Sequence, residues 1–387
     1  MGGLSVAIVA GETSGDALGA ALIEALRARV PDLQVAGVAG PRMRAAGCES
    51  LADARELSVM GLFEVLPHLP RLLRLRARLV GEIAARRPDV FIGVDYQQFN
   101  RGLARRLKQR GLATVQYVSP QVWAWRQGRV RTIGRAFDLV LCLLPFEPEF
   151  YREHAVAAQF VGHPLADQIP MQADRAAARA ALGLDPRASV VALLPGSRLS
   201  EVQQLATPFL QTAALLRQRR AGLALIAPMA GSEVRRAFER TLALQPSALP
   251  VRILDGQSRI ALTAADAALV ASGTATLEAL LCRCPMVVAY RFATVTAWLL
   301  RALRMVRLPY FALPNLLGGE RLAPEFLQEA VLPAPMAQAL ERLLEDSAHR
   351  QYLLQRFQDI HVTLQQKGAA LAAEAVLQLV RARTGRP

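Results

Sequence analysis

The chain has 387 residues, 52% of them hydrophobic and 20% charged, a composition that supports two folded domains and argues against intrinsic disorder. Its net charge of +14 suits phosphorylated substrates or an anionic membrane surface, but the chain lacks a nucleic-acid-binding motif of known spacing, so no nucleic acid partner is expected. No uninterrupted apolar run of about 18 residues occurs, so no transmembrane helix is predicted.

Short β-rich apolar runs alternate with longer helical patterns along the first half of the chain. The patterns predict strands at residues 6–10, 90–94, 114–118 and 139–143, with helices at 16–29 and 101–110. Such alternation is typical of parallel strands joined by helical crossovers.

The same rhythm restarts in the second half. Strands are predicted at residues 190–194, 223–227, 251–254 and 267–270, with helices at 201–219 and 274–282. We therefore predict an α/β protein of two doubly wound Rossmann-like domains facing a cleft, with ligands at the carboxyl ends of strands. The expected parts are residues 1–166, residues 167–365 and a helical tail at 366–387.

A run of small and polar residues, 11–16, follows the first predicted strand and opens a helix. Ser14 and Gly15 there could contact an anion or a hydroxyl-rich ligand at the helix N-terminus. The equal alternative is an ordinary capped turn, with Ser14 or Asp16 as the N-cap.

Asp95 stands at the end of a predicted apolar strand. A carboxylate at that position can act as a general base if a substrate hydroxyl comes within hydrogen-bond reach. A structural role, as a helix cap or acceptor, is equally compatible with the position alone.

Two further turns in the second half follow predicted strands. Gly196 and Ser197 offer backbone amides, and Arg198 a charged fork, to a phosphate, with Glu201 one turn on. A second turn of this kind, with a carboxylate one turn inside its helix, could reach a pyrophosphate and a sugar hydroxyl; its residues are Ser272, Gly273, Thr274 and Glu278.

Paired oxygen ligands for a divalent metal are absent from the sequence. No Asp-x-Asp occurs, and none of the four cysteines forms a Cys-x-x-Cys pair. We therefore expect no metal site and no cofactor, with Arg198 and helix N-termini stabilising a leaving group instead.

Leucine and arginine interleave between residues 62 and 80. This basic amphipathic pattern predicts a helix that docks on an anionic membrane. The expected contacts are Leu69, Leu72, Leu73, Leu75, Arg71 and Arg74. The alternative is a helix that turns its leucines to the core and its arginines to solvent.

Two tryptophans cluster in the loop at residues 117–126, where they could contact a sugar, an acyl chain or a membrane, or simply pack in the core. His163 stands beside a proline near the domain boundary, and we expect it to be structural.

Many short motifs of this chain resemble those of the lipid-A-disaccharide synthase family. They occur in unchanged order between residues 6 and 328, at 11–16, 37–43, 56–61, 64–66, 117–126, 162–164, 194–198, 271–278, 285–288, 290–291 and 313–317. The resemblance implies a glycosyltransferase B fold and a place on the cytoplasmic face of the inner membrane. It implies an inverting transfer from UDP-2,3-diacylglucosamine to 2,3-diacylglucosamine 1-phosphate, giving the β-1,6-linked lipid A disaccharide and UDP.

The family's functional residues match positions of this chain. Its aspartate falls on Asp95, its phosphate-contacting arginine on Arg198 and its asparagine on Asn315, while Gln328 closes the matched span and is expected to bind substrate. The chain departs from the family where Gln97 and Gln98 replace a proline and a second acid.

Two other functions remain open from the sequence. One is a UDP-sugar epimerase of the same fold, which would use no lipid acceptor. The other is a catalytically impaired lipid- or nucleotide-binding relative, an alternative that the two glutamines keep open. The sequence also leaves open whether the chain forms a homodimer.

Overall fold

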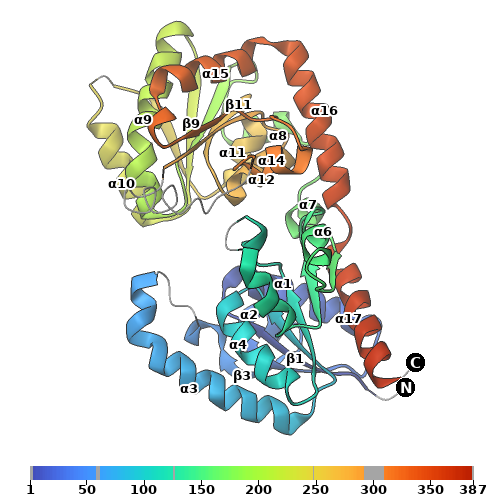
Figure 1. Cartoon of the computed structure of the whole chain (residues 1–387). Helices are drawn as coiled ribbons and strands as arrows, with labels where there is room; N and C mark the ends of the chain where they lie inside the picture. The colour runs from blue at the N-terminus through green and yellow to red at the C-terminus, as the bar shows by residue number, and fades with distance from the viewer. Residues whose placement is uncertain (1–2, 58–61, 125–126, 247, 292–308, 386–387) are drawn as a thin grey trace. The chain divides into compact units, whose positions relative to one another are not determined.

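The computed structural model describes residues 3–57, 62–124, 127–246, 248–291 and 309–385. The chain divides into two compact units, whose residues can be followed in Figure 1 by the colour, which runs with residue number. The first unit comprises Met1–Asp167 together with Leu364–Pro387, and the second comprises Gln168–Thr363. The C-terminal tail, which the sequence suggests as a separate part, thus belongs to the first unit.

A parallel sheet forms the centre of the first unit. Among the described residues it has seven strands in the order β3-β2-β1-β4-β5-β6-β7. The strands are β1 Ser5–Ala10, β2 Gln34–Ala39, β3 Glu49–Asp53, β4 Val90–Val94, β5 Ala113–Tyr117, β6 Leu139–Cys142 and β7 Ala158–Phe160. The helices are α1 Thr13–Arg27, α2 Pro41–Ala45, α3 Leu62–Arg86, α4 Gln97–Lys108, α5 Val130–Gly134, α6 Glu147–Arg152, α7 Pro164–Gln168 and α17 Gly368–Thr384.

The two faces of this sheet carry separate hydrophobic cores. Val6 and Ile8 of β1 pack into one core together with residues of α1 and α17. Ala7 and Val9 pack into the other core with residues of α3 and α4. This alternation follows from the two-residue period of a strand, and burial on both faces explains why the parallel strands read as continuous apolar runs.

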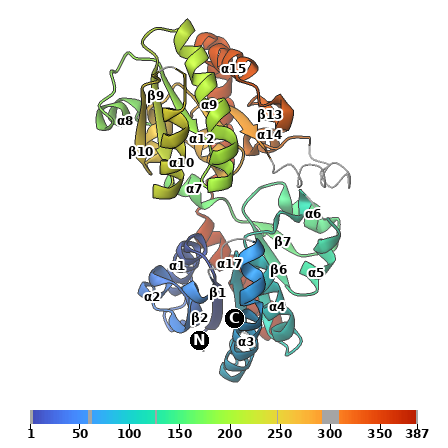
Figure 2. The same cartoon turned by 90° about the vertical axis from the view of Figure 1, so that its left-hand side faces the viewer.

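The second unit repeats the plan. Its six described strands are parallel and run in the order β10-β9-β8-β11-β12-β13. They are β8 Val190–Leu194, β9 Ala224–Met229, β10 Val251–Asp255, β11 Ala267–Ala271, β12 Met286–Tyr290 and β13 Glu325–Leu327. The helices are α8 Arg175–Ala181, α9 Leu199–Arg219, α10 Ser232–Ala243, α11 Ser258–Ala264, α12 Thr274–Leu281, α14 Leu313–Gly318, α15 Pro333–Glu345 and α16 Ser347–Leu364. Helix α9 packs against both α10 and α15 (Figure 2).

The predicted doubly wound α/β class is confirmed, and the strands that the sequence analysis missed lie away from the sheet centres. Strands β2 and β3 lie at one side of the first sheet, and β12 and β13 at one side of the second. Strand β2 includes a glycine, and β7 and β13 have only three residues each. The three-residue strands carry little of the apolar pattern on which sequence assignment depends, whereas β12 is a buried apolar run that the sequence analysis did not assign.

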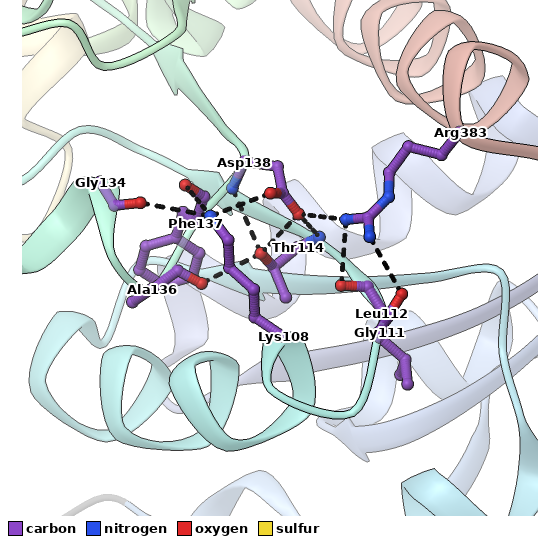
Figure 3. A network of polar contacts seen from close by, with 9 residues as sticks. All are labelled: Lys108, Gly111, Leu112, Thr114, Gly134, Ala136, Phe137, Asp138 and Arg383. Carbon is purple, nitrogen blue, oxygen red and sulfur yellow. Dashed lines mark hydrogen bonds and ion pairs between the residues drawn. The ribbon is translucent and has the colours of Figure 1, made fainter.

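The last helix is fastened to the first unit by a network of polar contacts, shown in Figure 3. The Arg383 guanidinium of α17 pairs with Asp138 at 2.8 Å and donates to the carbonyl oxygens of Gly111 and Leu112. Asp138 also pairs with Lys108 Nζ at 2.9 Å. Apolar residues of α17, among them Val376, lie in the same core as β1, so this helix is part of the first unit's packing.

Helix α3 buries part of the face that was predicted to dock on a membrane. Leu72 and Leu75 are buried at 8% and 6% exposure in the core beneath the helix, so their assignment to a membrane contact is wrong. Together with Leu79 they recur at the i, i+3, i+7 spacing of one helical face. Leu73, Arg71 and Arg74 lie on the exposed side, and the side chain of Leu69 falls outside the described part of the chain.

We expect serine substitutions on α3 to separate the two faces. Leu72→Ser or Leu75→Ser should cost about 2–5 kcal/mol of unfolding free energy, because each leaves a cavity and a polar group in the core. Leu73→Ser, one residue from Leu72 on the exposed side, should stay within about 0.5 kcal/mol of the parent. Thermal melts monitored by circular dichroism measure both, and a Leu72→Ser variant that melts with the parent would contradict the core assignment.

Candidate active site

The strand order of each sheet reverses at one point. In the first unit the reversal lies between β1 and β4, and in the second it lies between β8 and β11. Chains leave such neighbouring strands in opposite directions, which opens a crevice at their carboxyl ends where ligands of this class of fold bind. The loops after β4, β8 and β11 hold Asp95, Arg198 and Ser272, and Ser14 lies in the first turn of the helix that follows β1, so the fold places the main predicted site residues at its two switch points.

Asp95 follows directly on β4 and is half-buried. Its backbone and that of Tyr96 are left-handed, with φ of 51° and 30°, a conformation that non-glycine residues adopt rarely and that recurs at functional sites. The Asp95 amide donates to Tyr117 O at 2.9 Å. Burial raises the pKa of the Asp95 carboxyl, and the nearby Glu12 carboxylate raises it further. A carboxyl with a raised pKa is better matched to taking a proton near neutral pH.

Glu12 is a site residue to which the sequence analysis gave no role. It follows β1 within two residues and is exposed, and its charge acts on both Asp95 and Tyr96. The signal was available, since an acid after the first strand of a doubly wound sheet lies at the switch point.

The loop after β1 approaches the Asp95 loop closely. A Cβ on Gly11 would lie 2.6 Å from Tyr96 Cγ, so a larger residue would displace the tyrosine. Ser14 is exposed in the first turn of α1, and Gly15 is buried. Both therefore lie at the switch point, and their contact with a ligand stays a prediction.

The alternative that Ser14 or Asp16 is the N-cap of this helix is wrong. Glu12 is the N-cap residue of α1, without a side-chain cap hydrogen bond. Asp16 is buried inside the helix and accepts from the amides of Arg42 and Met43 at 2.9 and 3.0 Å. It caps the start of α2 instead, an acceptor role at a helix N-terminus that suits a carboxylate.

In the turn after β8, the Glu201 carboxylate accepts from the backbone amides. Gly196 has a φ of 133°, which favours glycine. The Ser197 and Arg198 amides donate to Glu201 Oε2 at 3.0 and 3.3 Å, so the prediction that Ser197 presents its amide to a phosphate is not met in this structure. The carboxylate occupies the position by closing a capping box. The Arg198 side chain, 78% exposed, contacts Glu201 at 3.4 Å and remains well placed for an anion from solvent.

The turn after β11 opens α12. Gly273 is the N-cap residue, and it and Thr274 are exposed. Ser272 Oγ donates to Phe311 O at 3.3 Å. Glu278, predicted to reach a sugar hydroxyl, accepts from Ser258 Oγ at 2.9 Å and from Arg259 Nε at 3.2 Å.

Asn315 lies in the interior, with no exposed surface. Its amide donates to Ala323 O and Glu325 Oε1, both at 2.8 Å, and its carbonyl accepts from Ala323 N at 2.7 Å. Glu325, which the sequence analysis overlooked, also accepts from the amides of Phe311 and Ala312. The described contacts give Asn315 a positioning role in this loop, and direct contact with substrate stays a prediction.

Gln328 follows β13 in a left-handed conformation, with a φ of 52°. Its side-chain Nε2 is buried without a hydrogen-bond partner. A buried donor without a partner is costly in a folded protein and calls for an explanation. Contact of Gln328 with substrate stays a prediction.

The aromatic loop packs inward where it is described. Tyr117 and Trp123 are buried at 2% and 8% exposure. Trp123 Nε1 donates to the buried Glu147 carboxylate at 2.9 Å, and its ring packs edge-on against Phe146. Burial raises the pKa of Glu147 to about 7. Core packing therefore explains these two aromatics, while Trp125 and Arg126 fall outside the described residues.

His163 is structural, as predicted. Its Nδ1 accepts from the Leu165 amide at 3.2 Å. Burial lowers the pKa of His163 to about 4, so the ring is neutral at physiological pH.

The described residues lack two features that would bear on ligands and membranes. Within them, no group of three or more histidine, cysteine, aspartate or glutamate side chains could hold a metal ion. None of the described helices is long and apolar enough to cross a membrane.

Comparison with known proteins gives a consistent result. The family model for lipid-A-disaccharide synthetase matches residues 6–380. Lipid-A-disaccharide synthases of Alkalilimnicola ehrlichii and Pseudomonas aeruginosa strain UCBPP-PA14 are each 53% identical, over 97% and 98% of this chain and 98% and 99% of theirs. Among solved structures, the glycotransferase of kitacinnamycin superposes with a TM-score of 0.62 at 18% identity, covering 97% of this chain and 98% of that one. The fold expected from the resemblance, that of glycosyltransferases B, is thereby confirmed.

Proposed function

Because this chain belongs to the lipid-A-disaccharide synthase family, we propose that it joins UDP-2,3-diacylglucosamine to 2,3-diacylglucosamine 1-phosphate and releases UDP. The chain is a hexosyltransferase of lipid A biosynthesis. The identity of the two substrates and the β-1,6 linkage are what we propose. Membership over nearly the whole length separates it from a UDP-sugar epimerase, which shares only the fold.

The observation that carries the mechanism is the position of Asp95 at the switch point of the first unit. Its raised pKa favours it as the general base that removes the proton from the acceptor's 6-hydroxyl. The freed oxygen attacks the anomeric carbon of the donor as the bond from that carbon to the UDP oxygen breaks. UDP leaves with the bonding electrons, and in-line attack inverts the α-linked donor to a β product.

In this proposal the second unit contacts the departing UDP. Arg198 offers an exposed guanidinium for the pyrophosphate. Gly273 and Thr274 begin α12, whose N-terminus favours negative charge. The buried Gln328 donor is proposed to meet a polar group of the donor substrate.

We propose that the reaction needs no metal ion. The chain has no Asp-x-Asp pair, the usual carrier of a divalent cation in metal-dependent sugar-nucleotide transfer, and Arg198 can supply positive charge at the leaving group.

Gln97 and Gln98, which replace the family's proline and second acid, begin α4. Position 97 is the first residue of the helix, where proline is favoured but not required. Gln98 is exposed, so the change removes a surface carboxylate and leaves the Asp95 backbone as described. We therefore favour an active enzyme over an impaired relative.

We expect the purified protein to form UDP and disaccharide from both diacylated substrates in the presence of excess chelator.

Asp95→Asn should lower turnover roughly 10²–10⁴-fold, the usual contribution of a positioned base. Asp89→Asn is the matched control. Asp89 directly precedes β4, the strand that Asp95 follows, and its carboxylate accepts from the Ser5 amide of β1. Near-parental turnover in a folded Asp95→Asn variant would remove the base from the mechanism, and inhibition by chelator that magnesium reverses would refute the metal-free proposal.

Arg198→Ala should weaken UDP binding roughly 10- to 100-fold, the range of a lost charge-assisted hydrogen bond. Titration calorimetry with UDP measures it directly. Arg217→Ala, near the opposite end of α9, controls for loss of net charge and should bind as the parent does. Equal affinity in the two variants would show that Arg198 serves only to close the turn with Glu201.

We propose that the protein works at the cytoplasmic face of the inner membrane as a peripheral protein. The outer side of α3 supports this, with Arg71 and Arg74 exposed and Leu73 at 44% exposure. Each arginine near anionic lipid contributes about 1 kcal/mol. Co-sedimentation of the parent and of Leu73→Ser with anionic vesicles tests this, and equal sedimentation of the two would exclude Leu73 from the contact.

A further inference from the structure

Three non-glycine residues at the carboxyl ends of β4 and β5 have a left-handed backbone. They are Asp95, Tyr96 and Val118, with φ of 51°, 30° and 77°. For a β-branched residue such as Val118 this conformation is a genuine outlier. Strain of this kind persists only when surrounding groups hold it. We therefore expect nearby side chains to hold the carboxyl ends of β4 and β5 in this conformation.

One buried side chain touches both strained ends. Gln116, in β5, has no exposed surface. Its Nε2 lies 3.0 Å from Asp95 O and 3.2 Å from the carbonyl oxygens of Tyr117 and Val118. Two hydrogens thus serve three carbonyl groups, and the amide ties the end of β4 to the end of β5. The reversed orientation would set the amide oxygen against three carbonyl oxygens, so the donors fix how this side chain lies.

A second buried amide reaches the same carbonyl from α4. Asn100 has no exposed surface, and its Nδ2 lies 3.1 Å from Asp95 O and 3.3 Å from Val94 O. It also lies 3.4 Å from Val9 O of β1. A Cβ on Gly93 would come within 2.8 Å of Asn100 Cβ, so glycine at that position leaves room for the amide. Asp95 O therefore accepts from two side chains that come from different elements.

These amides leave polar atoms unsatisfied. Gln116 Oε1 and Asn100 Oδ1 are both buried without a hydrogen-bond partner. An apolar side chain of similar shape would avoid that cost, but it would take these donors away from Asp95 O and Val118 O. The donors directed at Asp95 O are the property that an apolar side chain could not supply.

We propose that Gln116 and Asn100 are positioning residues that fix the direction of the Asp95 carboxylate. The backbone φ of Asp95 sets the direction of its Cα–Cβ bond, and the two amides hold the carbonyl that follows it. A base must lie within hydrogen-bond reach of the proton that it removes, and small displacements of it lower turnover. The proposal rests on the proposed role of Asp95 as that base.

The test compares Gln116→Met and Asn100→Leu with Thr114→Val. Methionine and leucine keep approximate volume and remove the donor. Thr114 is buried two residues before Gln116 in β5, and its hydroxyl bonds Ala136 O and Asp138 (Figure 3). Its replacement removes buried hydrogen bonds at the other end of the strand, so it controls for a general loss of stability.

We expect Gln116→Met and Asn100→Leu to lower kcat roughly 10- to 100-fold with unchanged KM, while Thr114→Val lowers the melting temperature and keeps kcat. Hydrogen exchange should accelerate at the Asp95 amide, which donates to Tyr117 O, in the first two variants and not in the third. At the Val118 amide, which donates to Leu141 O, it should accelerate in Gln116→Met alone. If Gln116→Met fails to fold, Asn100→Leu decides the question alone.

Two outcomes would overturn the proposal. One is exchange at Asp95 in both variants that matches the Thr114→Val control. The other is a kcat that falls no further than in that control while Asp95→Asn loses turnover. If Asp95→Asn keeps its turnover, the proposed base fails on its own, and the exchange rates still decide whether the two amides hold the Asp95 backbone.

Discussion

The reversal of strand order in each parallel sheet is the constraint from which the rest of this structure follows. In the first sheet β1 and β4 are neighbours, with later strands on one side and β2 and β3 on the other. Crossover connections must therefore leave these two strands toward opposite faces. The space left at their carboxyl ends is where Asp95, Glu12 and the Gly11 turn meet. The second sheet repeats the arrangement with β8 and β11.

Acidic side chains in this protein satisfy backbone amides repeatedly. Asp16 accepts from two amides at the start of α2, and Glu201 accepts from two in the turn after β8. Glu325 and Glu147 do the same in the loops at residues 311–312 and 143–144. Each is a local solution to helix starts and turns whose donors lack intrahelical partners. A carboxylate near a turn is thus ambiguous in the sequence, because the same chemistry serves a cap and a ligand contact.

Asp95 shares a pKa raised by burial with Glu147 and differs from these acids in its left-handed backbone. Burial and the Glu12 carboxylate raise the pKa of its carboxyl, whereas its carbonyl oxygen accepts from the side-chain amides of Asn100 and Gln116. A backbone hydrogen bond from Tyr96 lowers the pKa of the Asp95 carboxyl but does not offset the other two causes, while the two side-chain amides hold the backbone. Strained backbone, a raised pKa and a switch-point position coincide at this residue, a combination more typical of chemistry than of capping.

The sequence by itself determined the class of fold and the loops that matter. Apolar runs at β1, β4, β8 and β11 identify buried parallel strands, and small-residue turns follow β1, β8 and β11, because strand burial and tight turns are local properties of residue type. The family also follows from the motifs alone. Only the tertiary structure decided which face of α3 is buried, that Ser197 donates to Glu201, that α17 joins the first unit through Arg383, and that Gln116 holds the Asp95 loop. Each of these depends on which residues distant in sequence or on neighbouring turns come within hydrogen-bond or packing distance, and that is set by how the elements pack rather than by any local pattern.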